Sequence, residues 1–252
     1  MALASRHALV PLLLAGIPVL ARAQEASRPI QDNSFLIEEA YNQDRNVVQH
    51  ISTLVLGRDG GWVFNFTDEW PIGGPRDQGS VGATVLNGSG ATSFGALAFN
   101  YRRQAVGGVD AALVMAPRLS ALVGFSESGD QSNGGVAVQA MLPVTTVLSR
   151  SFVAHWNVGL TVGAGPTVLN TGASTVWLAL PWMNFLVEGL YLGVNGKEAT
   201  WIVSPGVRWA INLGSVQVVP GVALPFGLTR SQNSGVLLYL SVEHPFGPTD
   251  GH

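Results

Sequence analysis

Residues 201–212, WIVSPGVRWAIN, decide the fold of this chain, because they sort onto two unlike faces with a period of two. Large apolar residues make up one face: Trp201, Val203, Pro205, Val207, Trp209 and Ile211. Small and polar residues make up the other: Ser204, Gly206, Arg208, Ala210 and Asn212. A helix would mix the two sets, whereas a strand separates them. The stretch therefore predicts a β-strand with one apolar and one polar face.

The same alternation recurs along the chain. It is clear in residues 62–70, 152–163 and 236–246, where the last segment sets Tyr239, Ser241 and Glu243 opposite its apolar residues. Asp68 breaks the pattern of its segment, and we place it near a membrane edge. Weaker copies occupy residues 49–56, 78–87, 94–102, 111–123, 134–143, 175–183, 184–192 and 215–226. The total is about 12 strands, with a range of about 10 to 14, and an even number is typical of bacterial barrels.

The composition indicates that part of the protein faces something other than water. Charged residues make up 12% of the chain, against about 25% in ordinary globular domains, and the mean hydropathy is +0.29. After residue 23 there is no apolar run of about 18 residues, the length that a membrane-spanning helix needs. Only helices and closed barrels satisfy every backbone group in lipid. We therefore predict an all-β fold, a transmembrane antiparallel up-and-down β-barrel.

The amino terminus has the features of an exported protein. Arg6 and His7 precede the apolar run 8–20 and the small-x-small triplet 21–23, so we expect residues 1–23 to be a cleaved signal peptide. Residues 24–48 would then form an N-terminal segment, residues 49–246 the barrel and residues 247–252 a tail. Export of a barrel predicts an outer-membrane location, with outer-membrane lipid as a partner. The chain has no Cys, so it forms no disulfide.

Loop composition suggests an orientation for the barrel. With both barrel ends in the periplasm, the Gly-, Ser- and Asn-rich gaps become the outer loops. These are residues 57–61, 87–93, 124–133, 164–174, 193–199 and 227–234.

The segment 27–49 differs from the rest in its high density of charge. Asp32, Asn33 or Ser34 could cap a helix whose first turn contains Glu38 and Glu39. We predict a short amphipathic helix here, which lies in the periplasm, at the membrane face or in the lumen as a plug. In the last case Glu38, Glu39 and Tyr41 are the plug candidates, and we expect Arg118 or Arg208 to hold the acids.

The inward faces of the predicted strands collect a mixed-charge set of lumen-lining candidates. They are Glu69, Arg102, Arg118, Gln139, His155, Glu188, Arg208 and Glu243. Ionisable groups at membrane depth are paired or functional. Two interpretations follow: a lumen closed by ion pairs, and a permeation path or binding cavity.

Other functional classes lack support in the sequence. A lipid-facing Ser-His hydrolase needs an outward histidine, but the alternation turns His155 inward, and there is no G-x-S-x-G elbow. The five histidines form no ligand-spaced cluster, so we expect neither metal nor cofactor. A net charge of −3 argues against nucleic acid as a partner. We therefore expect that the protein is not an enzyme.

Several phrases of the chain resemble one family. QDNSFLIEEAYNQ, VVQHIST, GGWVFNFTDEWP, FVAHWNVG, SPGVRWA, VVPGVALPFG and LLYLSVEHPF are similar to uncharacterised outer-membrane proteins grouped with transporters of the phenol-degradation MetA-pathway type. The resemblance covers nearly all of the chain after residue 23. It implies an outer-membrane barrel and uptake of aromatic or other small hydrophobic compounds, and it implies no catalytic residues.

We therefore expect an outer-membrane channel or transporter for small molecules, with a small hydrophobic solute as its second partner. One alternative is a structural or interaction barrel with a closed lumen. The other is a lipid-modifying outer-membrane enzyme.

Overall fold

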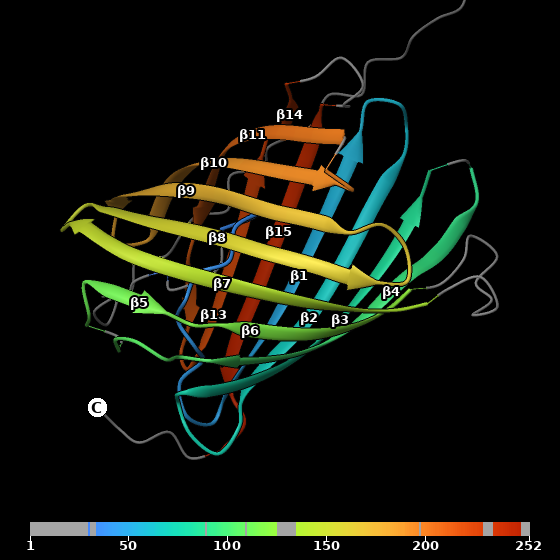
Figure 1. Ribbon diagram of the computed structural model, residues 1–252. Helices are drawn as coiled ribbons and strands as arrows, with labels where there is room; N and C mark the ends of the chain where they lie inside the picture. The colour runs from blue at the N-terminus through green and yellow to red at the C-terminus, as the bar shows by residue number, and fades with distance from the viewer. Residues whose placement is uncertain are drawn as a thin grey trace, which may run out of the picture.

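One antiparallel sheet closes on itself in the computed structural model, which describes residues 30, 34–88, 90–108, 110–124, 135–196, 198–228 and 234–247. The closing pair is β1 with β15 (Figure 1). The strands are β1 (Val47–Gly57), β2 (Trp62–Pro71), β3 (Asp77–Asn87), β4 (Thr92–Arg103), β5 (Leu113–Met115), β6 (Arg118–Gly124), β7 (Val136–Ser149), β8 (Phe152–Gly163), β9 (Val168–Leu180), β10 (Met183–Val194), β11 (Glu198–Trp209), β12 (Ile211–Leu213), β13 (Val216–Ala223), β14 (Phe226–Gly227) and β15 (Gly235–Pro245). The expected signal peptide, residues 1–23, lies outside the described residues.

These elements make a barrel of 12 strands, as predicted, because three short ones continue their neighbours. β5 pairs with β7 beside β6, β12 extends β11 along β13, and β14 extends β13 along β11. Each extension follows an interruption of one or two residues, such as Ala210 between β11 and β12. The interruptions bend the strands without changing the topology.

The strand boundaries differ from the prediction most at β9. The sequence predicted an outer loop over 164–174, but the strand already begins at Val168 and runs without a break to Leu180. Its first half, VLNTGAS, carries Thr, Asn and Gly, which read as a loop by composition. These residues are strand because Asn170, Gly172 and Ser174 lie opposite inward positions of β8 and β10.

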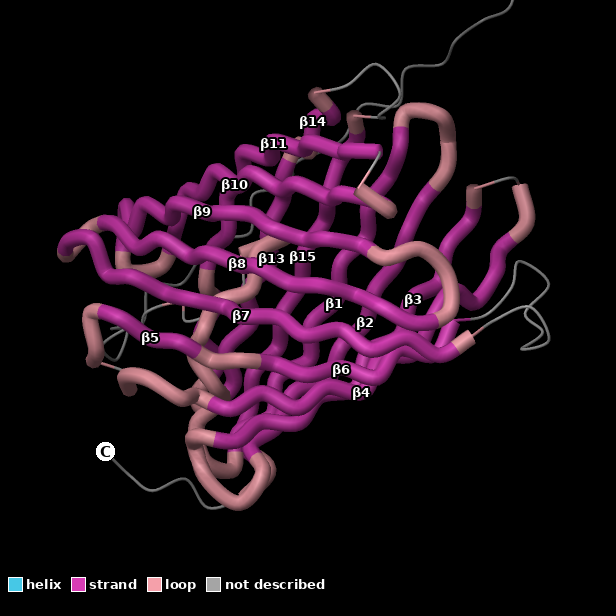
Figure 2. The backbone as a smooth tube through the Cα atoms, viewed as in Figure 1, coloured by secondary structure: helices cyan, strands magenta, loops and turns pink. Residues whose placement is uncertain are grey.

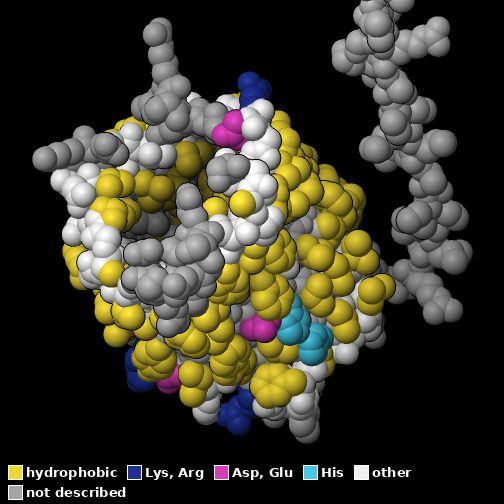
Figure 3. Space-filling view, turned by 90° about the vertical axis from the view of Figure 1, so that its right-hand side faces the viewer, with side chains coloured by type: hydrophobic (Ala, Val, Ile, Leu, Met, Phe, Trp, Pro, Cys, Tyr) yellow, Lys and Arg dark blue, Asp and Glu magenta, His cyan; other side chains and the backbone are white. Residues whose placement is uncertain are grey.

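The outer wall of the barrel is apolar. Large hydrophobic side chains are exposed on successive strands, among them Phe99, Leu119, Val138, Trp156, Val158, Leu160, Trp177, Val187, Trp201, Leu238 and Leu240. Figure 3 shows yellow hydrophobic side chains covering much of the face that it presents. A closed antiparallel barrel with an apolar exterior is the architecture of the bacterial outer membrane, and it indicates that location for this protein. Among the described residues, no helix is long and apolar enough to cross a membrane.

The N-terminal segment is not helical where the structure describes it. Residues 34–46, here called the luminal segment, form bends, irregular backbone and a turn at 45–46, and no helix appears in Figure 2. The predicted caps Asp32 and Asn33 lie outside the described residues. The luminal segment runs inside the barrel and ends at the rim where β1 begins. This rim, which also holds the end of β15, is called the periplasmic rim below, following the usual orientation of bacterial barrels.

Candidate functional site

Glu188 anchors the luminal segment from the middle of β10. Its side chain is fully buried, and Oε1 accepts hydrogen bonds from the backbone N–H groups of Leu36 at 2.7 Å and Ile37 at 3.0 Å. Glu188 points inward because its neighbours Val187 and Gly189 occupy the alternate face of the strand. A buried carboxylate therefore takes the place of the carbonyl groups that a helix would offer these two donors.

Three further wall side chains hold the backbone of the luminal segment. Asn157 on β8 pairs with both backbone groups of Glu38, accepting from its N–H at 2.8 Å and donating to its C=O at 2.9 Å. The N–H of Ala40 donates to Thr145 Oγ1 at 2.9 Å, and that of Gln43 donates to Gln78 Oε1 at 2.7 Å. Buried backbone groups must find partners, and here the wall supplies them. This explains why the predicted helix does not form over residues 34–46.

Lumen-facing glycines leave room for the apolar side chains of the luminal segment. A Cβ atom added to Gly206 would lie 2.5 Å from the ring of Phe35, and one added to Gly221 would lie 2.6 Å from the same ring. A Cβ on Gly172 would lie 2.5 Å from Cδ1 of Ile37. The Phe35 ring also contacts Tyr239, with 5.0 Å between the ring centroids. These three positions require glycine, because the side chains of Phe35 and Ile37 approach the strand backbone too closely for a Cβ atom.

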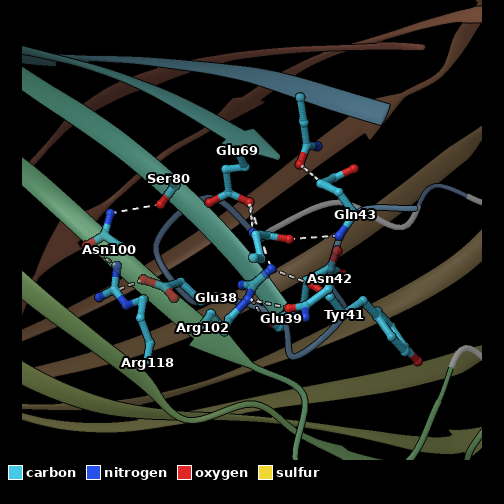
Figure 4. Close-up of polar contacts among 12 residues, drawn as sticks. Glu38, Glu39, Tyr41, Asn42, Gln43, Glu69, Ser80, Asn100, Arg102 and Arg118 are labelled. Carbon is cyan, nitrogen blue, oxygen red and sulfur yellow. Dashed lines mark hydrogen bonds and ion pairs between the residues drawn. The ribbon is translucent and has the colours of Figure 1, made fainter. Parts of the chain in front are cut away.

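Arg118 on β6 forms the ion pair with Glu38 that the sequence predicted. Its Nη2 lies 3.0 Å from Glu38 Oε1 and donates to Gln139 Oε1 at 2.6 Å. Gln139 in turn donates to Thr161 Oγ1 at 2.9 Å. Figure 4 shows Arg118 and Glu38 pointing toward each other across the lumen.

Arg102 on β4 binds the following residues of the luminal segment, 39–42. Its guanidinium donates to the side-chain carbonyl of Asn42 at 3.0 Å and to the backbone carbonyl of Glu39 at 3.2 Å (Figure 4). Its Nη2 lies 3.8 Å from Oε2 of Glu69, which also accepts a hydrogen bond from Gln78 at 2.7 Å. Glu69 and Arg102, both predicted to face the lumen, are therefore parts of one buried network.

The remaining candidates lie on the same inner surface. Glu243 and Glu39 line a small space with Tyr41 near the periplasmic rim. Burial, together with the carboxylate of Glu39, raises the pKa of Tyr41 to about 12, so its hydroxyl stays protonated at neutral pH. His155 and Arg208 are both buried, and Nδ1 of His155 lies 2.9 Å from Thr145 Oγ1.

A cavity of about 430 Å³ remains between the luminal segment and one side of the barrel. Its walls come from β1 to β4 and β6, from Tyr239 on β15 and from residues 34–38. Uncharged polar and small apolar side chains predominate among them, including Thr53, Asn65, Thr67, Thr84, Ala96, Ala98 and Asn100. Glu38, Glu69 and Arg118 supply its charges. The arrangement can admit a small solute beside the luminal segment.

Sequence reasoning missed the residues that hold the backbone of the luminal segment. Asn157, Thr145 and Gln78 are ordinary inward polar residues in the alternation, and nothing in their types marks them as partners of another segment. The glycine positions carried a signal, since Gly206 and Gly221 interrupt inward faces within predicted strands. Within the described part of the chain, no group of three or more His, Asp or Glu is arranged to hold a metal ion.

The fold and lumen define a 12-stranded antiparallel β-barrel of the outer-membrane kind, with a segment of its own chain inside. The chain is similar to the solved KdgM porin, with a TM-score of 0.55 and 8% identity over 80% of this chain and 99% of that one. It is also similar to the NanC porin, with a TM-score of 0.55 and 8% identity over 79% of this chain and 100% of that one. A KdgM structure in complex with disordered oligogalacturonate gives a TM-score of 0.54. At this identity the likeness concerns the fold. No family model matches the chain, and no curated protein matches it.

Proposed function

We propose that this protein is a passive outer-membrane channel for small molecules, in which the luminal segment restricts the path to a passage along β1 to β4 and β6. The cavity of about 430 Å³ carries this proposal. A barrel with a closed lumen, the main alternative, needs the same wall to be packed by side chains. The porin fold of the solved neighbours supports a channel.

The charges of the lumen disfavour anionic solutes. The described residues place Arg102, Arg118 and Arg208 inside the barrel against five glutamates: Glu38, Glu39, Glu69, Glu188 and Glu243. A polyanion such as oligogalacturonate, which one KdgM structure contains, requires an excess of positive charge along its path. The mixture of methyl, aromatic, amide and hydroxyl groups fits small amphiphilic molecules better. Small aromatic or other hydrophobic compounds, as the resemblance to the phenol-degradation type implies, are the cargo we propose.

Conductance of the purified protein in planar bilayers tests the proposal, with two tryptophan variants as a matched pair. Ala98 lines the cavity on β4, whereas Ala121 is exposed on the outer wall of the neighbouring β6. We expect Ala98→Trp to lower conductance several-fold and Ala121→Trp to leave it unchanged. Wild-type protein that folds but shows no conductance would favour the closed lumen, and equal conductance in both variants would show that the path does not run through this cavity.

The cargo class needs a separate assay. We expect small phenols to reduce the ion current through the wild-type channel as they occupy the cavity, and to do so less in Ala98→Trp. An anionic oligosaccharide that blocks the current more strongly than any uncharged compound would contradict the proposed cargo. Phospholipid turnover by the purified protein would instead support the enzyme alternative.

A further inference from the structure

Three ionisable side chains meet on the lipid-facing wall, near the periplasmic rim. His50 on β1 lies opposite Asp68 on β2, and His50 Nδ1 is 2.5 Å from Asp68 Oδ1. On the other side, His50 Nε2 lies 3.0 Å from Nε2 of His244 on β15. In Figure 3 two cyan histidines adjoin a magenta acid among yellow side chains; the remaining histidine that the structure describes, His155, is buried. His50 thus has partners on both strands that flank β1, Asp68 on β2 and His244 on β15.

The side chains of this cluster point outward by the alternation of their strands. Gln49 and Ile51, the neighbours of His50, are buried against the lumen. Glu243, next to His244, lines the space around Tyr41 inside the barrel. About a third of the His50 and Asp68 side-chain surface is exposed, 36% and 37%. Charge on the lipid face of a barrel is destabilising except near the interfaces, so a cluster here calls for a specific role.

The hydrogen bonds fix which nitrogen of each ring carries a proton. A carboxylate accepts, so His50 Nδ1 is the donor toward Asp68. A carbonyl also accepts, so His244 Nδ1 is the donor toward the backbone oxygen of Pro245 at 3.1 Å. In two neutral rings this leaves both Nε2 lone pairs facing each other across 3.0 Å. Two lone pairs at that distance repel, and a cation between them removes the repulsion.

The arrangement has the features of a metal-ligating pair. Histidine ligands commonly donate the other ring N–H to a carboxylate or a backbone carbonyl, which orients the ring; Asp68 and Pro245 fill these two roles. Nitrogen–metal distances are about 2.0 to 2.1 Å, so two Nε2 atoms separated by 3.0 Å can bind one ion at nearly a right angle. Square-planar and octahedral ions, above all Cu²⁺ and Ni²⁺, have that geometry.

We propose that His50 and His244 form a binding site for one divalent transition-metal ion, with Cu²⁺ preferred, and that Asp68 positions His50 for it. The protein supplies two ligands to this ion. Groups of three or more ligating side chains do not occur among the described residues. Water or a lipid phosphate oxygen at the interface completes the coordination. Because β1 and β15 are the closing pair of the sheet, a bound ion would tie the first strand of the barrel to the last.

Titration of the untagged, detergent-solubilised full chain with Cu²⁺, Ni²⁺ and Zn²⁺ tests this site. Isothermal titration should give one Cu²⁺ per chain, with Cu²⁺ bound more tightly than Ni²⁺ or Zn²⁺. The paramagnetic resonance spectrum of bound Cu²⁺ should show coupling to two ring nitrogens. Affinity should fall as the pH falls, because protons compete with the metal for both Nε2 atoms.

Three substitutions and one control separate this site from adventitious binding. His50→Ala and His244→Ala should each remove Cu²⁺ binding, and Asp68→Asn should weaken it about 10- to 100-fold. Ser52→Ala, on the same outward face of β1, should leave the affinity unchanged. If His50→Ala fails to fold, His244→Gln near the strand end gives the same test. Absence of Cu²⁺ binding in the wild type, or affinity retained in both histidine variants, would overturn the proposal in favour of a proton shared between the rings.

Discussion

The two sides of the lumen wall treat the luminal segment differently. On β7 to β11, Thr145, Asn157 and Glu188 are buried and bind its backbone directly, and glycines receive its apolar side chains. At the same depth on β1 to β4, residues such as Thr53, Thr84 and Ala98 face a cavity. Over residues 34–38 the segment leaves a passage against β1 to β4, whereas nearer the periplasmic rim Gln78 on β3 and Arg102 on β4 also bind its backbone. The path through this barrel is therefore set by which wall binds the segment.

Removal of the luminal segment should have the largest effect on this asymmetry. Deletion of residues 34–46 takes away the occupant of the β7 to β11 side, and we expect conductance to rise several-fold. The barrel should still fold, because its 12 strands pair without the segment. Single-channel recording gives the conductance, and the heat-dependent gel shift of folded barrels is the control. Unchanged conductance in a folded deletion variant would show that the segment does not restrict the path.

Glu188→Ala should loosen the segment without removing it. The change leaves the buried N–H groups of Leu36 and Ile37 without their acceptor, and a buried donor without a partner costs about 1 to 3 kcal/mol. We expect faster hydrogen exchange at residues 36–40 and a noisier, larger current. Glu188→Gln keeps an acceptor oxygen, so its effect should be intermediate. Equal hydrogen-exchange rates in Glu188→Ala and the wild type would show that Glu188 does not anchor the segment.

Gly206→Ala should displace the ring of Phe35. The new methyl group would lie 2.5 Å from that ring, and overpacking of this kind costs about 1 to 3 kcal/mol. Gly189→Ala on β10 is the matched control, since nothing lies within 4 Å of a Cβ atom there. Chemical unfolding in detergent measures the difference. Equal stability of the two variants would mean that the glycine does not hold Phe35 in place.

Arg118→Ala should have the smallest effect, and it should act on ion selectivity. It removes a positive charge from the cavity and leaves Glu38 and Glu69 there. We expect a shift of about twofold toward cations, since charged side chains set selectivity in pores. The reversal potential in a salt gradient reports the shift. A shift toward anions would contradict the placement of these charges in the path.

The barrel was predictable because its signal is local. Each strand alternates by itself, as residues 201–212 show, and the inward position of Arg208 and Glu188 follows from that period alone. The boundary errors arose where alternation is weak. In β9, residues such as Asn170 and Gly172 are polar or small enough to read as loop.

The lumen was less predictable because its contacts join distant segments. Charge balance predicted that Arg118 or Arg208 would hold Glu38 and Glu39, and the structure pairs Glu38 with Arg118. The hydrogen bonds from Asn157 and Thr145 to the backbone of the luminal segment could not be predicted in this way. Amide and hydroxyl side chains face the lumen of a barrel for many reasons. The sequence predicted a short helix within residues 27–49, and the described part of that segment, residues 34–46, is not helical because wall side chains accept hydrogen bonds from its N–H groups.

Cysteine accessibility tests the asymmetric passage most directly, since the chain has no native Cys. Thr84→Cys places a thiol in the cavity wall on β3, and Ser204→Cys places one at a fully buried inward position of β11. A charged methanethiosulfonate reagent should reduce the current through the Thr84→Cys channel within minutes and leave the Ser204→Cys channel unchanged. Rapid block of Ser204→Cys with no block of Thr84→Cys would place the passage on the opposite wall and contradict the account.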